Sequence, residues 1–212
     1  RVDRRQRQMC IRDSNIAWQD AALFCNWLSE KENLPKFYNV VGDRVTSINW
    51  DSNGYRLPTE SEWSWVAKLT KAGSTKVFPW NSPSYPPPFV SGNYADESAK
   101  SMLPFTISNY NDSFPVSASV ESFQPNEKGI FNLSGNVAEW VNDFYEIRVN
   151  KSEPLVDYRG PNTGNRHVIR GASWALGSRS ELRLSYREPG NNGKIDVGFR
   201  IARYVDKPKV DL

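Results

Sequence analysis

The stretch GYRLPTESEW, residues 54–63, contains the clearest helix start in this chain of 212 residues. Thr59 and Glu62 have the spacing of a capping box, in which each side chain accepts a hydrogen bond from a backbone N–H of the other residue. Apolar residues then recur on one face of the segment 63–67, with the period of a helix. We therefore predict a helix that begins at this capping box and ends at about Leu69.

A second amphipathic helix is predicted upstream, over residues 20–31. Its apolar side chains follow the i, i+3, i+4, i+7 spacing of one helix face, at Ala21, Phe24, Cys25 and Leu28. Two short strand-like runs, 37–41 and 44–48, then flank the turn residues Gly42 and Asp43. We predict two short strands joined by this turn.

Residues 70–130 read as one long irregular connection. Four prolines between residues 83 and 88 exclude a helix there, and Asn, Asp and Ser dominate the stretch 93–113. A structureless segment of this length inside one domain needs something to order it. A bound cation would do so, and so would packing of its many aromatic side chains.

The last third of the chain contains strand-like pieces at 141–147, 167–169 and 197–203. The last piece alternates large apolar side chains with others, which is the pattern of a half-buried strand. Because we find no internal repeat and no change in composition, we predict one α+β domain with two helices, short antiparallel strands and much coil. Aromatic residues at 13%, with 13 Gly and 14 Pro, favour a loop-rich fold pinned by buried rings.

The net charge of +3 comes from residues 1–14, which contain five Arg and two Asp. Without them 22 basic and 22 acidic side chains remain, so we expect no nucleic-acid partner. We interpret residues 1–14 as a non-native tract, similar to a translated sequencing adapter, or as a disordered basic arm, and residues 15–212 as the domain. The sequence contains no run of eighteen apolar residues, so we predict no transmembrane segment in it. The cellular compartment stays open, because a targeting signal would lie upstream.

Cys25 and His167 offer little for catalysis by themselves. Cys10 falls in the tract 1–14, so Cys25 has no disulfide partner inside the domain and is expected to be a small buried side chain. Zinc sites, histidine-based triads and three-histidine iron sites need more than the single histidine of this sequence. We expect His167 at the surface or as a hydrogen-bonded core residue.

Seven short motifs occur in a fixed order along residues 15–204. They are NIAWQDA (15–21), YRLPTESEW (55–63), FPW (78–80), GNYAD (92–96), GIFNLSGNVAEW (129–140), RGASW (170–174) and GFR (198–200). Together they resemble the formylglycine-generating enzyme family, also called sulfatase-modifying factors. The resemblance implies a fold related to C-type lectins, with little regular secondary structure. It also implies further strands ahead of Asn15, so we expect the N-terminal part of the domain to be missing.

The true generating enzymes of this family contain a copper site, and the resemblance implies which positions of this chain correspond to it. There, two cysteines after the Arg-Gly-Gly-Ser-Trp element bind one copper ion and activate oxygen, which converts a substrate cysteine to formylglycine. Carried onto this sequence, the two positions fall on Leu176 and Glu181. Neither side chain suits Cu(I), which prefers thiolates, so we expect no copper and no such oxidase activity. The related ergothioneine sulfoxide synthases, which use iron held by histidines of an attached domain, stay open as an alternative.

The resemblance also implies two calcium sites, whose oxygen ligands are side-chain amides, backbone carbonyls and carboxylates. The first set comprises the Asn132 side chain, the Gly135 and Val137 carbonyls and the Glu139 carboxylate. The second set comprises the Asn93 side chain, the Tyr94 carbonyl, the Asp112 carboxylate and the Phe114 carbonyl. The second set would tie together both ends of the stretch 93–114. The alternative is that these Asn, Asp and Gly residues only form turns.

A candidate ligand surface surrounds the lost copper pocket. We expect Ser173 and Trp174 to line a pocket, and Arg179 and Arg183 to contact a ligand, since Trp and Arg are favoured in recognition. The alternative is a solvated face with one core Trp. The sequence thus predicts a non-catalytic, calcium-stabilised binding or scaffold module for an unknown peptide, protein or carbohydrate. The competing hypothesis is a superfamily enzyme completed by a missing domain or by a different metal centre.

Overall fold

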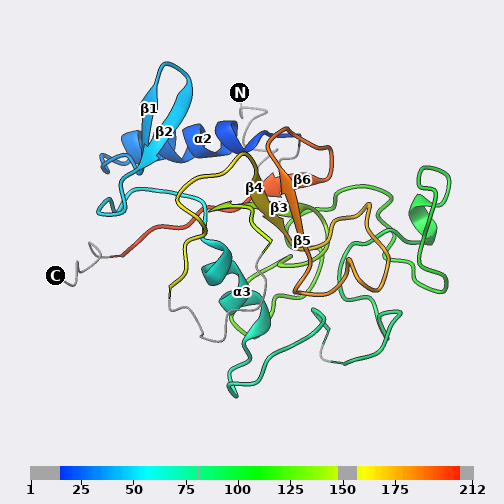
Figure 1. Cartoon of the computed structure of the whole chain (residues 1–212). Helices are drawn as coiled ribbons and strands as arrows, with labels where there is room; N and C mark the ends of the chain where they lie inside the picture. The colour runs from blue at the N-terminus through cyan, green and yellow to red at the C-terminus, as the bar shows by residue number, and fades with distance from the viewer. Residues whose placement is uncertain (1–14, 81, 148–156, 206–212) are drawn as a thin grey trace, which may run out of the picture.

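The computed structural model describes residues 15–80, 82–147 and 157–205, so the predicted tract 1–14 lies outside the described residues. Two helices, a hairpin, a small sheet and long loops confirm the predicted α+β class (Figure 1). The elements are α2 (Trp18–Lys31), β1 (Tyr38–Val41), β2 (Arg44–Ile48), α3 (Glu60–Lys68), the 3₁₀ helix η1 (Glu97–Ala99), β3 (Ala138–Phe144), β4 (His167–Arg170), β5 (Arg187–Gly190) and β6 (Val197–Phe199). No helix in the described ranges is long and apolar enough to span a membrane.

The capping box at the start of α3 is confirmed. The Thr59 hydroxyl accepts from the Glu62 N–H at 3.1 Å, and the Glu62 carboxylate accepts from the Thr59 N–H at 2.8 Å. The same carboxylate binds the buried guanidinium of Arg56 through hydrogen bonds of 2.6 and 2.7 Å. Arg56 in turn forms an isolated backbone bridge with Ala202. The helix start is therefore also a junction that joins the segment before α3 to the end of the domain.

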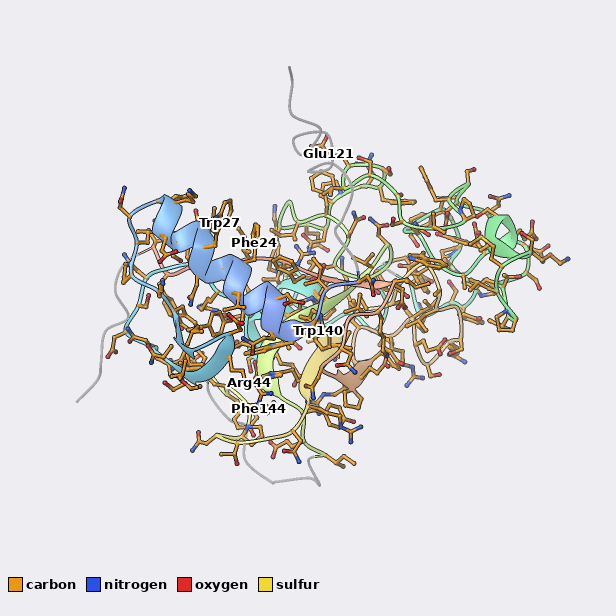
Figure 2. The ribbon with its side chains drawn as sticks, turned by 90° about the horizontal axis from the view of Figure 1, so that it is seen from above. Phe24, Trp27, Arg44, Glu121, Trp140 and Phe144 are labelled. Atoms are coloured by element: carbon orange, nitrogen blue, oxygen red, sulfur yellow. The ribbon has the colours of Figure 1, made fainter. Side chains whose placement is uncertain are left out.

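Helix α2 begins two residues before its predicted start, and the predicted hairpin follows it as β1 and β2. Asn26 on the helix joins the two: its amide donates to the Tyr38 carbonyl at 2.7 Å and accepts from the Tyr38 N–H at 3.1 Å. Figure 2 shows Phe24 and Trp27 on the helix and Trp140 near its N-terminal end, where the Trp140 indole donates to the Ile16 carbonyl at 2.8 Å.

The larger sheet has the strand order β5-β4-β3-β6. Strands β3, β4 and β5 pair antiparallel, as predicted, and β6 adds one parallel pairing with β3 that the sequence did not indicate. Strand β3 begins three residues before the predicted position, and β6 ends at Phe199, short of the predicted residue 203. The sequence analysis missed β5 because Arg-Glu-Pro-Gly has no strand pattern. At a sheet edge the proline is tolerated, since its missing N–H costs less there.

Three apolar clusters form the core. One lies between α2, the hairpin and the sheet, and includes Trp18, Cys25 and Trp140. Another packs α3 against the sheet through Trp63 and Val141. Because Trp140 and Val141 are neighbours in a strand, their side chains point to opposite faces. Helices α2 and α3 therefore cover opposite faces of the sheet (Figure 1).

The remaining cluster orders the long connection between α3 and β3. It gathers aromatic and aliphatic side chains from distant loops: Phe78, Trp80, Tyr94, Ile107, Tyr110, Ala172 and Leu182. Phe78 and Trp80 stack with ring centroids 4.7 Å apart, and the Tyr110 hydroxyl donates to the Gly92 carbonyl at 2.5 Å. Aromatic packing is thus one agent that orders residues 70–130, as expected.

Cys25 and His167 are both core residues. Cys25 is completely buried, and burial raises the pKa of its thiol to about 12. The His167 ring stacks on Trp18 with centroids 3.5 Å apart, and its Nδ1 lies 3.2 Å from the Asn142 carbonyl, to which it donates. Burial lowers the pKa of His167 to about 4, so its ring is neutral at pH 7. The expectation of a hydrogen-bonded core histidine is confirmed.

Candidate functional site

Three loops that are far apart in the sequence lie against one another: residues 93–96, 132–137 and 172–177. Backbone hydrogen bonds of 2.8 to 3.0 Å join them, from the N–H of Asn136 to the Asn93 carbonyl, of Gly135 to Ala172, of Trp174 to Asn136 and of Ala95 to Leu176. The structure therefore brings both predicted calcium sets and the predicted copper position into one layer of loops.

Gly135 allows two of these loops to approach closely. Its φ of +96° lies in the region that favours glycine. A Cβ atom at this position would lie 3.0 Å from both the Asn93 carbonyl oxygen and the Tyr94 ring. A larger residue would therefore push the loop 132–137 away from the Asn93 set.

The Asn93 set contains oxygen atoms of buried side chains. Asn93 is completely buried, and its Nδ2 donates to the Val116 carbonyl at 2.8 Å, which fixes the orientation of the amide. Its Oδ1 is buried and has no hydrogen-bond partner among the described residues. The carboxylate oxygens of Asp112 accept from the N–H groups of Tyr94 and Phe114, both at 2.9 Å.

A second buried carboxylate, Asp96, lies against Asp112. Asp96 accepts from the Asp112 N–H and caps η1 by accepting from the Ser98 N–H at 2.8 Å. Burial raises the pKa of Asp112 to about 7; the amides of Tyr94 and Phe114 oppose this rise, and the charge of Asp96 adds to it. A cation among these oxygens would offset the repulsion and lower the pKa of Asp112.

The Asn132 set is arranged differently. Its carboxylate, Glu139, is almost completely buried and accepts from Nε and Nη2 of Arg200, both at 2.5 Å, and from the Trp63 indole at 2.8 Å. The Asn132 amide donates to the Val120 carbonyl at 2.8 Å. Arg200 thus already supplies the positive charge that a metal ion would bring. An ion at this set would compete with Arg200 for the Glu139 carboxylate or share it with this guanidinium.

The donor chemistry of the loop layer favours a hard cation. Within the described parts of the chain, no group of three or more His, Cys, Asp or Glu side chains could hold a metal ion. An ion must therefore also use amide and carbonyl oxygens, which suit Ca²⁺. The Asn93 set fits this requirement, because it combines an unpaired amide oxygen with the buried carboxylate of Asp112 and the neighbouring Asp96.

The two positions that match the copper cysteines form a closed turn. Leu176 packs against the aromatic cluster of the long connection. The Glu181 carboxylate accepts from the N–H groups of Gly177 and Ser178, at 3.3 and 2.9 Å, and the Ser178 hydroxyl accepts from the Glu181 N–H at 3.4 Å. An aliphatic side chain and a carboxylate held by backbone amides do not fit a Cu(I) site.

The predicted ligand residues divide into two buried and two exposed side chains. Ser173 is completely buried and donates to Asp196 at 2.7 Å, and Trp174 is only 4% exposed. Arg179 and Arg183 are exposed on the surface of the same loop. Ser173 and Trp174 therefore support the loop from inside, where they cannot touch a ligand on its surface.

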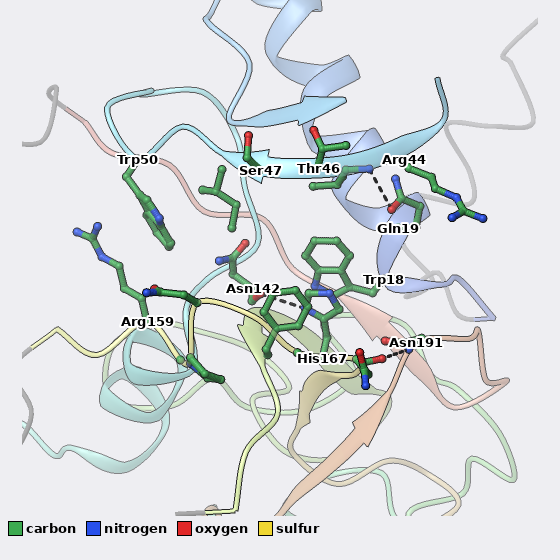
Figure 3. Close-up of a pocket in the computed structure, with 18 residues that line it drawn as sticks. Trp18, Gln19, Arg44, Thr46, Ser47, Trp50, Asn142, Arg159, His167 and Asn191 are labelled. Carbon is green, nitrogen blue, oxygen red and sulfur yellow. Dashed lines mark hydrogen bonds between the residues drawn. The ribbon is translucent and has the colours of Figure 1, made fainter. Parts of the chain in front are cut away.

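The sequence analysis missed a cavity of about 910 Å³ on another part of the domain (Figure 3). It lies between β2, the start of α2, strands β3 and β4, and the segment 159–165. Its walls include Trp18, Trp50 and His167. The sequence signal for it was weak, because these residues come from separate elements and each reads as an ordinary core side chain.

Comparison with proteins of known sequence identifies relatives of this chain. The chain is 29% identical to the formylglycine-generating enzyme of Streptomyces coelicolor over 185 residues, which cover 84% of this chain and 55% of that enzyme. It is 28% identical to the inactive C-alpha-formylglycine-generating enzyme 2 of Mus musculus, over 92% of this chain and 57% of the relative. The chain thus spans a little over half the length of these two relatives.

Comparison with solved structures gives the same result. Treponema denticola variable protein 1 aligns with a TM-score of 0.70 and 28% identity, over 92% of this chain and 70% of that protein. Residues 13–205 match the Sulfatase-modifying factor enzyme 1-like domain. The chain therefore belongs to this family of sulfatase-modifying-factor domains, also known as formylglycine-generating enzyme domains.

Proposed function

We propose that this domain is a non-catalytic binding or scaffold module that calcium stabilises. The observation that carries the proposal is the turn at residues 176–181. There the family's two copper-binding cysteines are replaced by Leu176 and by Glu181, whose carboxylate is held by backbone N–H groups. The Cys25 thiol cannot replace them, since it is buried in the cluster under α2 and its pKa is raised to about 12.

Family membership alone does not decide the activity. The relatives include proteins named as generating enzymes and a mouse protein named as inactive. Because one fold can carry different functions, the activity has to be argued from the residues of the site. The side chains at positions 176 and 181 therefore carry more weight for this chain than its overall similarity.

The calcium part of the proposal rests on the Asn93 set. Asn93 Oδ1, the Asp112 carboxylate and the carbonyls of Tyr94 and Phe114 would hold the ion, with Asp96 next to them. A bound Ca²⁺ would supply charge neutralisation and would join both ends of the stretch 93–114. Its role would be to stabilise the loop layer, since none of these groups is placed to react with a substrate.

The test of the non-catalytic assignment is an aldehyde assay. The protein is incubated with Cu(I), oxygen and a Cys-x-Pro-x-Arg peptide, and the peptide is analysed by mass spectrometry. We expect no formylglycine, whereas the Streptomyces coelicolor relative serves as the positive control. Aldehyde formed by this chain would contradict the proposal and would favour an enzyme with a different metal centre.

A further inference from the structure

We propose that the cavity between the hairpin and the sheet binds an acidic saccharide, a hydroxylated ring that carries a carboxylate (Figure 3). The proposal names a ligand class for the binding role proposed above and rests on that role, but it uses none of the residues of the loop layer. The volume of about 910 Å³ lies at the upper end of the range of ligand pockets, so the cavity has room for an oligosaccharide.

One wall of the cavity is a stack of three rings. His167 lies between Trp18 and Phe144, with centroid distances of 3.5 and 4.4 Å and interplanar angles of 5° and 28°. His167 is neutral at pH 7, so this wall carries no charge. Its aromatic rings are flat and largely apolar. Trp50 adds a further indole to the lining. Such faces suit the C–H surface of a sugar ring.

Asn142 contributes a side-chain amide to the lining of the cavity. The Tyr38 hydroxyl accepts from the Leu57 N–H at 3.0 Å, so its own proton is donated to Asn142 Oδ1, also at 3.0 Å. This fixes the orientation of the amide, so that Oδ1 is the acceptor for Tyr38 and Nδ2 is the donor that the side chain can offer to a ligand. Asn142 lines the cavity, so a ligand hydroxyl can accept this hydrogen bond.

The charge of the lining selects an anion. Arg44 and Arg159 line the cavity, and among the described residues no Asp or Glu does. The Arg159 guanidinium lies 4.3 Å from the Trp50 ring centroid. Neither arginine forms an ion pair with a carboxylate of the described residues, in contrast to Arg56, which is paired with Glu62. A ligand carboxylate would supply the missing partner through hydrogen bonds to a guanidinium.

The polar lining matches hydroxyl groups in the ligand. Besides Asn142, the cavity is lined by the side chains of Ser47, Asn162 and Asn165. Amide and hydroxyl side chains both donate and accept hydrogen bonds, as sugar hydroxyls do. Together with the aromatic wall and the two arginines, this set fits a uronic or sialic acid better than a purely apolar or a cationic ligand.

The experiment measures binding of three probes by titration calorimetry: trigalacturonic acid, glucuronic acid and N-acetylneuraminic acid. Maltotriose, which has hydroxyls but no carboxylate, is the matched neutral ligand, and AMP tests for a phosphate ligand. We expect at least one acidic saccharide to bind, and maltotriose to bind about tenfold more weakly than trigalacturonic acid. No binding of any acidic probe at about 10 mM, or tighter binding of AMP, would overturn the proposal.

Two surface variants locate the site. Arg159→Ala should weaken binding of the acidic probe about tenfold, because it removes a guanidinium from the cavity. Lys71→Ala, at an exposed basic residue that does not line the cavity, should leave the affinity unchanged. Equal affinities for the two variants would contradict the proposal. The aldehyde assay is independent of this titration, so failure of the non-catalytic assignment and failure of saccharide binding give different results.

Discussion

Two neighbouring regions of the loop layer differ in how their carboxylates are buried and hydrogen-bonded. We call residues 93–114 the acid loop and residues 176–181 the Glu181 turn. In the Glu181 turn one partly exposed carboxylate accepts from two backbone N–H groups, and the turn is complete without a metal. In the acid loop Asp96 and Asp112 are both buried, and Asn93 Oδ1 is buried without a partner among the described residues. The comparison teaches that backbone N–H groups satisfy the carboxylate of the Glu181 turn, whereas the acid loop keeps a buried amide oxygen unpaired, and we therefore propose the cation for the acid loop.

The largest expected effect comes from the variant Asp112→Asn in the presence of calcium. If the acid loop holds the ion, an excess of Ca²⁺ of about 100 times Kd stabilises the wild type by about 3 kcal/mol, or roughly 5–10 °C in Tm. Asp112→Asn should lose most of this gain. Thermal unfolding in calcium and in chelator measures it. As a control, Thr59→Ala should cost about 1 kcal/mol in both buffers, because the α3 cap is remote from the ion.

The pH dependence of the metal-free protein gives the next effect. Burial raises the pKa of Asp112 from 3.8 to about 7, so between these values the folded state holds more protons than the unfolded state. The free energy of unfolding should therefore fall as pH rises from about 4 to 7, by an amount of the order of 2 kcal/mol. His167, with its lowered pKa, acts in the opposite direction between about 4 and 6.5.

The difference between wild type and Asp112→Asn isolates the aspartate, since the other titrating groups are common to both proteins. In chelator, the variant should gain stability relative to the wild type as the pH rises through this range. Denaturant unfolding at a series of pH values measures the difference. A difference that stays constant from pH 4 to pH 7 would show that Asp112 does not carry the expected buried charge.

The smallest effect is expected in the Glu181 turn. Glu181→Ala removes the acceptor for the N–H groups of Gly177 and Ser178 and should cost about 1 kcal/mol. The cost should be equal in calcium, in chelator and with added Cu(I), because the turn binds no ion. Unfolding curves in the three buffers test this, and a loss of stability that depends on copper would break the contrast between the two regions.

Local signals in the sequence predicted the regular elements well. The capping box of Thr59 and Glu62 and the apolar face of residues 20–31 act within one or two turns of chain, so they can be read without the fold. Strand β5 and the parallel pairing of β6 could not be predicted in this way. Their partners lie far away in the sequence, and Arg-Glu-Pro-Gly becomes a strand only because β4 lies beside it.

Only part of the candidate site was predicted, and that part came from the resemblance to a family and not from local sequence patterns. The resemblance to a family suggested both calcium sets, and the structure places them in one layer. It could not reveal that Arg200 pairs with Glu139, which lies 61 positions earlier in the sequence. Nor could it reveal the cavity between the hairpin and the sheet, whose walls come from five separate segments and depend on the tertiary fold.

The most direct test of the central claim is native mass spectrometry in the presence of both Ca²⁺ and Cu(I). The variant Cys10→Ser removes the cysteine of residues 1–14 as a source of copper binding. The account predicts a calcium adduct that Asp112→Asn abolishes and Glu181→Ala retains, and no copper adduct. A copper adduct, or the absence of calcium from the Cys10→Ser protein, would contradict it.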